Sequence, residues 1–430
     1  MRGKSGIQTR ALHKVTNLAH FLFSPIKQDN HYDKGKVPPD ARTPLTPEQC
    51  ALVKKQFSVD LVVEPSTVRC FTDAEYTAQG IELSSDLDDC DVLMGVKEVP
   101  VHQLIPDRTY LFFSHTIKKQ QQNRRLLQAI LEKNIRLIDY EMLTDERGDR
   151  LIAFGFYAGL GGAHNALWTY GQRTGLFSLP RMCETHDYAR VRESYSSVQL
   201  PPVRIVLTGG GRVASGAVRN LHDMGIHQVS PHDFLTKNFD RPVFTQLFAS
   251  DYVQHKNGPR IFDKDHFYAH GEEYVSIFKP YAHRADIMIN GIFYDPKAPL
   301  FFTVREMADP GFSLQVIADI SCDIVPNASV PVTVHPSSID NPVFGFDRFT
   351  GRECAPFQTS SVDVMAIDNL PSELPRDASL FFGKQLIENV LPELIHGRDS
   401  AVIRRAIIAE NGQLTERFAY LSDYVLEKAT

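Results

Sequence analysis

The stretch VRIVLTGGGRVASGA, residues 203–217, decides the fold class of this chain. An apolar run over Val203–Thr208 leads into three consecutive glycines, and a helical pattern through Leu221 and Met224 follows. Glycines allow a tight turn, and the N-terminus of a helix offers free N–H groups and a positive dipole end to a phosphate. The order strand, turn, helix therefore predicts a pyrophosphate site. Its expected residues are Gly209, Gly210, Gly211, Arg212 and Val213.

The spacing of the glycines departs from the usual G-x-G-x-x-G pattern. Gly209 and Gly211 fit it, but the third glycine, Gly216, arrives two positions late. A lone glycine motif is weak support for a nucleotide site, so a glycine-rich turn without any ligand is the alternative.

The choice between the two nicotinamide dinucleotides depends on the ribose of the adenosine. A residue that reads this ribose is expected about 20 residues further on, at the tip of the next strand. We expect that strand to end near residues 228–230, which makes Ser230 and Asp233 the candidates. Ser230 is not an acid, and His232 and Arg212 could meet a 2′-phosphate. This favours NADP(H) slightly over NAD(H).

Further apolar runs before and after this stretch indicate parallel strands. Most are continuous rather than alternating, as in strands that are buried on both faces. A helical pattern over residues 119–133 lies between two of them, which predicts a βαβ unit and a doubly wound α/β fold. The expected strands are Val92–Lys97, Tyr110–His115, Ile135–Tyr140, Val203–Thr208, Ala285–Phe293 and Leu314–Ile320.

The length of 430 residues predicts two domains, because a single core stops growing at roughly 250–300 residues. The segment Gln172–Pro202 is rich in Gly, Pro and Ser and is expected to be an interdomain connection. Residues 238–280 look like a long irregular insertion to which we assign no role. Helical patterns are expected over Ala378–Leu391 and Gln413–Lys428.

Composition and charge exclude several classes of partner. The chain is 43% hydrophobic and 23% charged, with a formal net charge of −6, so a basic surface for nucleic acid or an anionic membrane is not expected. Six scattered cysteines without C-x-x-C or zinc spacing predict no metal site. No apolar run is long enough to span a bilayer, and no signal peptide is visible, so we expect a cytoplasmic protein. The oligomeric state cannot be read from the sequence.

Three expected strands end in residues that could do chemistry. Lys97 and Glu98 follow the first, His115 the second and Glu141 the third, with Arg150 a short loop later. Ligands of open α/β sheets bind beyond the carboxyl ends of the strands, so these residues suggest one site. Taken singly, a His at a strand end is more often structural, and a Lys–Glu pair is usually a surface pair.

Several of these segments resemble the saccharopine dehydrogenase (lysine–2-oxoglutarate reductase) family, of the alanine dehydrogenase-like superfamily. The similarity runs from about Gly35 to the C-terminus and thins over residues 238–280. The segments FFSHTIK and IDNLP are quite specific to this family. Members of the family also commonly have the third glycine two positions late. The matching segments are Asp91–Pro100, Arg108–Lys118, Ile135–Glu141, Arg150–Gly159, Thr208–Ala217, Ala318–Asp323 and Ile367–Pro371.

The resemblance implies two Rossmann-like domains with a cleft between them, and the interconversion of saccharopine with lysine and 2-oxoglutarate by means of NAD or NADP. The substrate domain would comprise residues 1–160 and 370–430, and the dinucleotide domain residues 161–369. By resemblance, Lys97 and His115 match the acid–base pair. The substrate-binding residues implied are Arg42, Glu98, Lys118, Glu141, Arg150 and Asp368.

The front of the chain departs from the family. The family normally has a strand directly before the loop that corresponds to residues 35–47, and no such strand is visible there. The first strand of the substrate domain and the placement of Arg42 therefore have no support from the sequence.

Two other functions stay open at this point. One is an alanine dehydrogenase or another opine-type dehydrogenase, since that superfamily shares the architecture. The other is a catalytically silent nucleotide-binding regulator, against which Lys97 and His115 argue.

Overall fold

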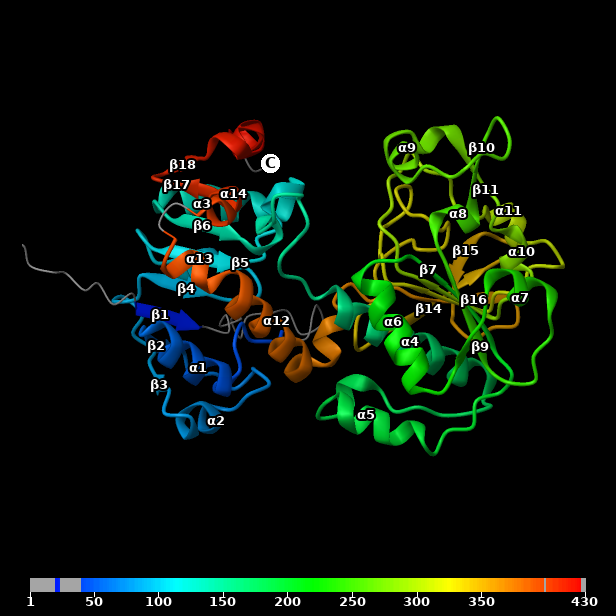
Figure 1. Cartoon of the computed structure of the whole chain (residues 1–430), viewed down its shortest axis with the longest axis horizontal. Helices are drawn as coiled ribbons and strands as arrows, with labels where there is room; N and C mark the ends of the chain where they lie inside the picture. The colour runs from blue at the N-terminus through cyan, green and yellow to red at the C-terminus, as the bar shows by residue number, and fades with distance from the viewer. Residues whose placement is uncertain (1–19, 24–39, 398–399, 427–430) are drawn as a thin grey trace, which may run out of the picture.

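The computed structural model describes residues 20–23, 40–397 and 400–426, and within them it contains two large sheets (Figure 1). In each sheet six neighbouring strands are parallel, and an antiparallel pair extends one edge. Apolar side chains are buried on both faces of each sheet. These features confirm the predicted doubly wound α/β fold.

The first sheet has the strand order β18-β17-β6-β5-β4-β1-β2-β3. Its six parallel strands follow the order 3-2-1-4-5-6, which is usual for dinucleotide-binding folds. The strands are β1 (His20–Phe23), β2 (Asp60–Val63), β3 (Glu82–Leu83), β4 (Val92–Met94), β5 (Thr109–Phe112), β6 (Arg136–Asp139), β17 (Ile407–Glu410) and β18 (Gln413–Leu414).

Strand β1 corrects the expectation that no strand precedes the loop of residues 35–47. The strand ends at Phe23, well before that loop, and pairs in parallel with β2 and β4 at the centre of the sheet. The strand therefore stands further from the loop than the family pattern places it.

The second sheet has the order β15-β14-β16-β13-β12-β7-β9-β8. Its strands are β7 (Arg204–Thr208), β8 (His227–Gln228), β9 (Val243–Leu247), β12 (Ile287–Asn290), β13 (Val316–Asp319), β14 (Val343–Asp347), β15 (Arg352–Cys354) and β16 (Ser361–Met365). A separate hairpin joins β10 (Val253–His255) and β11 (Tyr274–Ser276).

Strand β9 corrects the interpretation of residues 238–280 as irregular. It lies beside β7 over its full length, while β8 lies at the edge of the sheet. The strand order on this side is therefore β7-β9-β8, and the two-residue β8 does not touch the strand that leads into the glycine turn.

The segment Gln172–Pro202 is not an interdomain connection. Leu179, Met182 and Val191 of this segment are buried in the same core as β7, so the segment belongs to the second sheet. The chain passes between the sheets earlier, where α4 (Gly155–Thr174) begins. The boundary expected at residue 160 falls inside α4, and the division into two domains stays a prediction.

Helices cover both sheets, and α4, α6 and α12 lie between them (Figure 1). The predicted helical pattern at residues 119–133 corresponds to α3, and that at 378–391 to α12. The pattern at residues 413–428 is instead divided between β18, a 3-10 helix η8 (Glu416–Leu421) and α15. The helices are α1 (Pro47–Phe57), α2 (Asp73–Ala78), α3 (Arg124–Glu132), α5 (Tyr188–Tyr195), α6 (Arg212–Asp223), α7 (Pro231–Thr236), α8 (Ala249–Tyr252), α9 (Lys264–Ala269), α10 (Lys279–Ala282), α11 (Val304–Met307), α12 (Pro375–Asn389), α13 (Leu391–Ile395), α14 (Ala401–Ala406) and α15 (Ser422–Leu426).

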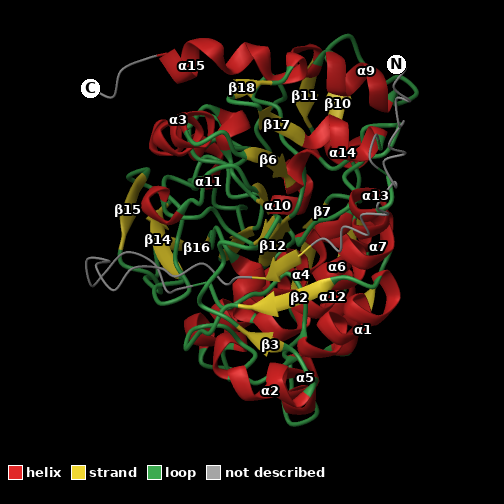
Figure 2. Ribbon diagram, turned by 90° about the vertical axis from the view of Figure 1, so that its left-hand side faces the viewer, coloured by secondary structure: helices red, strands yellow, loops and turns green. Residues whose placement is uncertain are grey.

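Two glycines allow α4 and α6 to cross in direct backbone contact. The helices lie side by side in both views (Figure 1, Figure 2). A Cβ on Gly216 would lie 1.8 Å from the carbonyl oxygen of Phe156, and a Cβ on Gly159 would lie 1.7 Å from that of Val213. The position of the late third glycine is thus set by the helix that crosses α6.

Candidate active site

Three neighbouring strands of the first sheet bring polar side chains to one edge. Lys97 and Glu98 follow β4, His115 follows β5, and Glu141 follows β6. His115 Nδ1 lies 3.9 Å from Glu98 Oε2. The structure therefore brings these residues together, and their roles stay a prediction.

Glu141 holds two cations at the rim of this site. Its side chain is only 5% exposed, and its Oε1 accepts a hydrogen bond from Arg150 Nη2 at 2.8 Å. Lys118 Nζ lies 3.6 Å from the same oxygen. Arg150 and Lys118 are each about half exposed, so both can also meet a ligand.

Two carboxylate oxygens at this edge have no hydrogen-bond partner among the described residues. They are Oε2 of Glu98 and Oε2 of Glu141, and both are buried. A buried acceptor without a donor is costly, so these oxygens fit a ligand that carries N–H groups.

The electrostatics of the site centre on His115. Burial, followed by the positive charge of Lys97, lowers its pKa below the usual value for histidine. The negative charges of Glu98 and Glu141 oppose this shift. Burial and Lys97 therefore favour the neutral form of the His115 imidazole, which can accept a proton.

The carboxyl edge of the second sheet contributes residues on the opposite side. Asp368 is exposed and follows β16. Burial raises the pKa of Cys322 to about 12, and the charges of Asp319 and Asp368 add to this rise. Burial also raises the pKa of Asp323, while the charge of Lys118 opposes the rise.

Arg42 is buried and already paired. Its guanidinium donates two hydrogen bonds to Asp40, at 2.9 and 2.5 Å, and one to Asn369 at 2.9 Å. It also lies over the ring of Phe154, 4.3 Å from the centroid. The structure therefore places Arg42 at the junction of the two sheets with its hydrogen bonds directed to the protein. Its expected contact with a substrate carboxylate stays a prediction.

The glycine turn has the geometry that a phosphate needs. Gly209 has a φ of +110°, and a Cβ there would lie 2.5 Å from the carbonyl oxygen of Gly291. Gly211 is the N-cap of α6, and a Cβ there would meet nothing within 4 Å. The N-terminus of this twelve-residue helix thus faces open space, which fits the pyrophosphate of a dinucleotide.

A buried hydrogen-bond network supports the turn from below. Thr208 Oγ1 donates to Asn290 Oδ1 at 2.7 Å, and Asn290 Nδ2 donates to Asp319 at 2.8 Å. Thr333 Oγ1 also donates to Asp319, at 2.6 Å. The ends of β7, β12 and β13 are therefore locked to one another beneath the expected phosphate site.

The two expected sites meet at Arg212. Its Nη1 donates to the backbone oxygen of Arg150 at 2.8 Å. The first residue of α6 thus contacts the loop that carries the cationic rim of the first sheet, with Val213 directly after it.

Ser230 and Asp233 lie away from the glycine turn. Ser230 Oγ accepts from the backbone N–H of Asp233 and caps α7, while Asp233 Oδ2 lies 3.0 Å from Lys237 Nζ. Both residues follow the edge strand β8, so neither occupies the strand end beside β7. That position belongs to β9, which the sequence analysis missed, although the apolar run Val243–Leu247 was its visible signal.

Phe248 follows β9 and faces the glycine turn. A Cβ on Gly210 would lie 2.7 Å from the ring of Phe248, which is itself 52% exposed. The first acid beyond it, Asp251, accepts a hydrogen bond from the backbone N–H of Phe248 at 2.8 Å.

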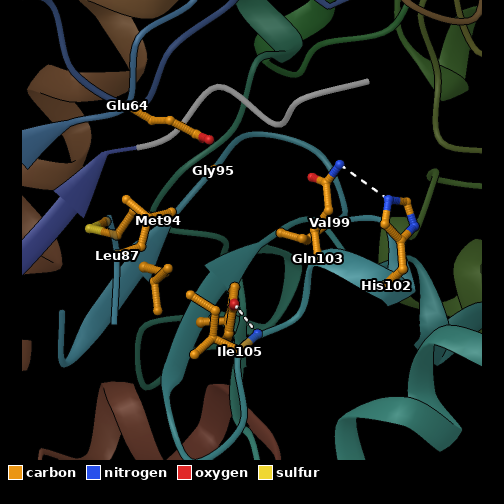
Figure 3. A pocket seen from close by; sticks show the side chains of 10 residues that line it. Glu64, Leu87, Met94, Gly95, Val99, His102, Gln103 and Ile105 are labelled. Carbon is orange, nitrogen blue, oxygen red and sulfur yellow. Dashed lines mark hydrogen bonds between the residues drawn. The ribbon is translucent and has the colours of Figure 1, made fainter. Parts of the chain in front are cut away.

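A separate pocket with an empty volume of about 820 Å³ borders the Lys97 loop (Figure 3). Figure 3 shows Glu64 and the hydrogen-bonded pair Gln103 and His102 around it. Gly95 and Val99 belong to its lining, but none of the predicted catalytic or substrate-binding residues does.

In the described part of the chain, no three His, Cys, Asp or Glu side chains are grouped so that they could hold a metal ion. None of the described helices has the length and apolar character that crossing a bilayer requires.

Comparisons with known proteins show what this chain is similar to. Residues 34–161 match the family model of the alanine dehydrogenase/PNT N-terminal domain. The chain is 31% identical to α-aminoadipic semialdehyde synthase of Arabidopsis thaliana, over 89% of this chain and 40% of that protein. It is 29% identical to the NAD(+)-dependent, L-lysine-forming saccharopine dehydrogenase of Emericella nidulans, over 82% of this chain and 89% of that protein. The chain thus spans less than half the length of the semialdehyde synthases it matches.

Solved structures share the fold. An L-alanine dehydrogenase superposes with a TM-score of 0.60 at 13% identity, covering 94% of this chain and 99% of that one. A transhydrogenase from Sinorhizobium meliloti superposes with a TM-score of 0.57 at 12% identity, covering 92% and 100%. These similarities lead to one conclusion: over most of its length the chain is similar to α-aminoadipic semialdehyde synthases and saccharopine dehydrogenases, and its residues 34–161 match the alanine dehydrogenase/PNT N-terminal domain.

Proposed function

We propose that this protein is a nicotinamide-dependent oxidoreductase that interconverts saccharopine with L-lysine and 2-oxoglutarate. The observation that carries the proposal is the group of Lys97, Glu98, His115, Glu141 and Arg150 at the edge of the first sheet. The names of its relatives support the same chemistry.

The residues fit the substrates of this reaction. Lysine carries amines, and the buried Oε2 atoms of Glu98 and Glu141 lack donors among the described residues. Each substrate also carries carboxylates, which arginine binds through two parallel hydrogen bonds. Arg150 retains exposed donor groups beside Glu141 and can serve this purpose.

The proposed chemistry requires protons to move around the hydride transfer. The ε-amine of lysine must attack the ketone as a free base, and the neutral imidazole of His115 can take its proton. The resulting carbinolamine loses water, and the ammonium of Lys97 can protonate the departing hydroxyl. Glu98 and Glu141 stabilise the positive charge that the substrate nitrogen carries during these steps. The bound reduced nicotinamide supplies the hydride.

The residues present fit a dinucleotide. The N–H groups at the start of α6 would hold the pyrophosphate, because Gly211 leaves the space before them open. We infer that the adenosine ribose lies near the end of β9, since β9 is the strand beside β7. Asp251 caps its own helix there, so no acid follows the strand directly. The slight preference for NADP(H) over NAD(H) stays a prediction.

A matrix of substrates and cofactors tests the proposal. The purified full chain is mixed with NADPH or NADH and with either lysine plus 2-oxoglutarate or pyruvate plus ammonia. Oxidation of the cofactor is followed by absorbance. We expect turnover with lysine plus 2-oxoglutarate, and faster turnover with NADPH than with NADH at equal concentration.

Two outcomes would overturn the proposal. Turnover with pyruvate and ammonia alone would identify an alanine dehydrogenase. Tight cofactor binding without turnover in any mixture would identify a nucleotide-binding regulator.

A further inference from the structure

A buried carboxylate beneath the proposed acid–base group is not explained by the chemistry above. Asp139 is the last residue of β6 and has no exposed surface. Its Oδ2 accepts hydrogen bonds from both the backbone N–H and the hydroxyl of Ser114, the former at 3.0 Å. Its Oδ1 accepts from the backbone N–H of Glu141 at 2.7 Å. One side chain therefore binds the residues next to two different strand ends.

The contact with Ser114 controls the backbone that carries His115. Ser114 Oγ lies 2.8 Å from Thr116 Oγ1 and accepts a longer hydrogen bond from the backbone N–H of Thr116. Ser114 and Thr116 are both fully buried. His115 thus lies between Ser114, which binds Asp139 directly, and Thr116, which is linked to Asp139 through the hydroxyl of Ser114.

His115 itself adopts a backbone conformation that needs such support. Its φ is +53°, in the left-handed region that side chains with a Cβ rarely occupy. Conformations of this kind persist only where the surroundings over-determine them, and they gather at functional sites. The fixed neighbours Ser114 and Thr116 supply this constraint.

The contact with Glu141 controls the second group. Asp139 caps the short 3-10 helix η4 (Tyr140–Met142), and this cap orients the backbone from which Glu141 extends. Glu141 in turn binds Arg150. Displacing Asp139 would therefore move both an expected proton acceptor and an expected carboxylate clamp.

We propose that Asp139 is a positioning residue that fixes His115 and Glu141 relative to each other. It does not reach the substrate, since it has no exposed surface. The expected effect on kcat/KM rests on the proposed function, whereas the expected effect on the position of His115 does not. Burial raises the pKa of Asp139 to about 6, and the hydrogen bond from Ser114 opposes the rise. The carboxylate is therefore ionised at pH 7 and can accept from all three donors.

The test compares Asp139→Asn with Asp363→Asn. Asp363 is a matched control because it is also fully buried and also accepts from a serine hydroxyl and a backbone N–H, at Ser361 and Phe357. It lies beside Arg173, at the end of α4, away from the acid–base group. Each variant is measured by thermal unfolding, by kcat/KM against pH, and by NMR titration of His115, whose signal is assigned from its loss in His115→Gln.

For Asp139→Asn we expect kcat/KM to fall roughly 10- to 100-fold, the scale of a reacting group misplaced by about 1 Å. The His115 titration should shift from that of the unaltered protein, because the imidazole would leave the buried position that lowers its pKa. Asp363→Asn should lower the unfolding temperature but leave the pKa of His115 unchanged. If Asp139→Asn does not fold, Ser114→Ala takes its place, with a smaller change in the same direction.

The proposal is overturned if the His115 titration is the same in Asp139→Asn, or in its substitute, as in the unaltered protein. The titration needs no turnover. An inactive unaltered protein would refute the proposed function while leaving the positioning role open to the NMR result.

Discussion

Replacing Gly216 with alanine should push α4 and α6 apart. The new Cβ would lie 1.8 Å from the carbonyl oxygen of Phe156 and 2.9 Å from the backbone nitrogen of Leu160. Non-bonded heavy atoms are attracted at about 3.5–4.0 Å, so the helices would have to separate by roughly 1.5 Å. No rotation of a side chain can relieve the clash, because both atoms belong to the backbone of α4.

The loss in free energy of unfolding follows from the rigidity of the α4 backbone. Overpacking a core typically costs about 1–3 kcal/mol, and we expect about 3 kcal/mol here because backbone must move. For a domain of this size, that loss should lower the unfolding temperature by roughly 6–12 °C. Fluorescence is a suitable probe, since the only tryptophan of the sequence, Trp168, lies in α4.

Gly211→Ala is the matched control. It adds the same methyl group five positions earlier, at the N-cap of α6, but its Cβ would meet nothing within 4 Å, and its φ of −93° suits alanine. Its unfolding temperature should stay close to that of the unaltered protein. Equal unfolding temperatures for Gly216→Ala and Gly211→Ala would refute the close crossing of α4 and α6.

Three further predictions concern the chemistry, the cofactor and pH. Lys97→Met should lower kcat by roughly 10²-fold or more, the scale of lost acid–base catalysis, with cofactor affinity kept; a near-normal rate would make Lys97 a structural residue. Gly211→Asp should fold, because its Cβ has room, but lose cofactor binding in a fluorescence titration, because its carboxylate would repel the pyrophosphate. Unchanged affinity would place the phosphates elsewhere. Burial lowers the pKa of His164 to about 4. The folded protein therefore holds the neutral imidazole more readily than the unfolded chain, and the free energy of unfolding should fall as the pH drops from 6.5 toward 4. The free energy of unfolding, measured in urea, should fall by about 3 kcal/mol. His164→Gln should show a smaller fall between pH 7 and pH 4.5. An equal fall in both proteins would contradict the role of His164.

Local patterns were sufficient to predict most of the fold. The continuous apolar runs before Lys97, His115 and Glu141 became β4, β5 and β6, because strands buried on both faces need apolar residues at every position. Since parallel strands end at a common edge, the sequence also predicted which residues gather there. The run Val203–Thr208 and the glycines after it predicted β7 and its turn for the same local reason.

Among the strands that the sequence analysis did not predict, β1 and β9 have a common cause for their omission. β1 has four residues and β9 has five, and neither stands at the spacing expected from its neighbours. Each forms because it completes a sheet whose other strands are already specified. Such a strand is stabilised by partners far away in the sequence, which a local pattern does not contain.

The sequence by itself determined the class of fold, the glycine turn and the groups at the strand ends, because each follows from the order of residues within one strand and its turn. Only the tertiary structure decided that β9 lies beside β7, that Arg42 is paired with Asp40 and Asn369, and that Gly216 faces α4. It alone showed Asp139 joining two strand ends beneath His115. These features depend on contacts between segments that are far apart in the sequence. The backbones approach each other closely, and the charges become buried, only when the chain is folded.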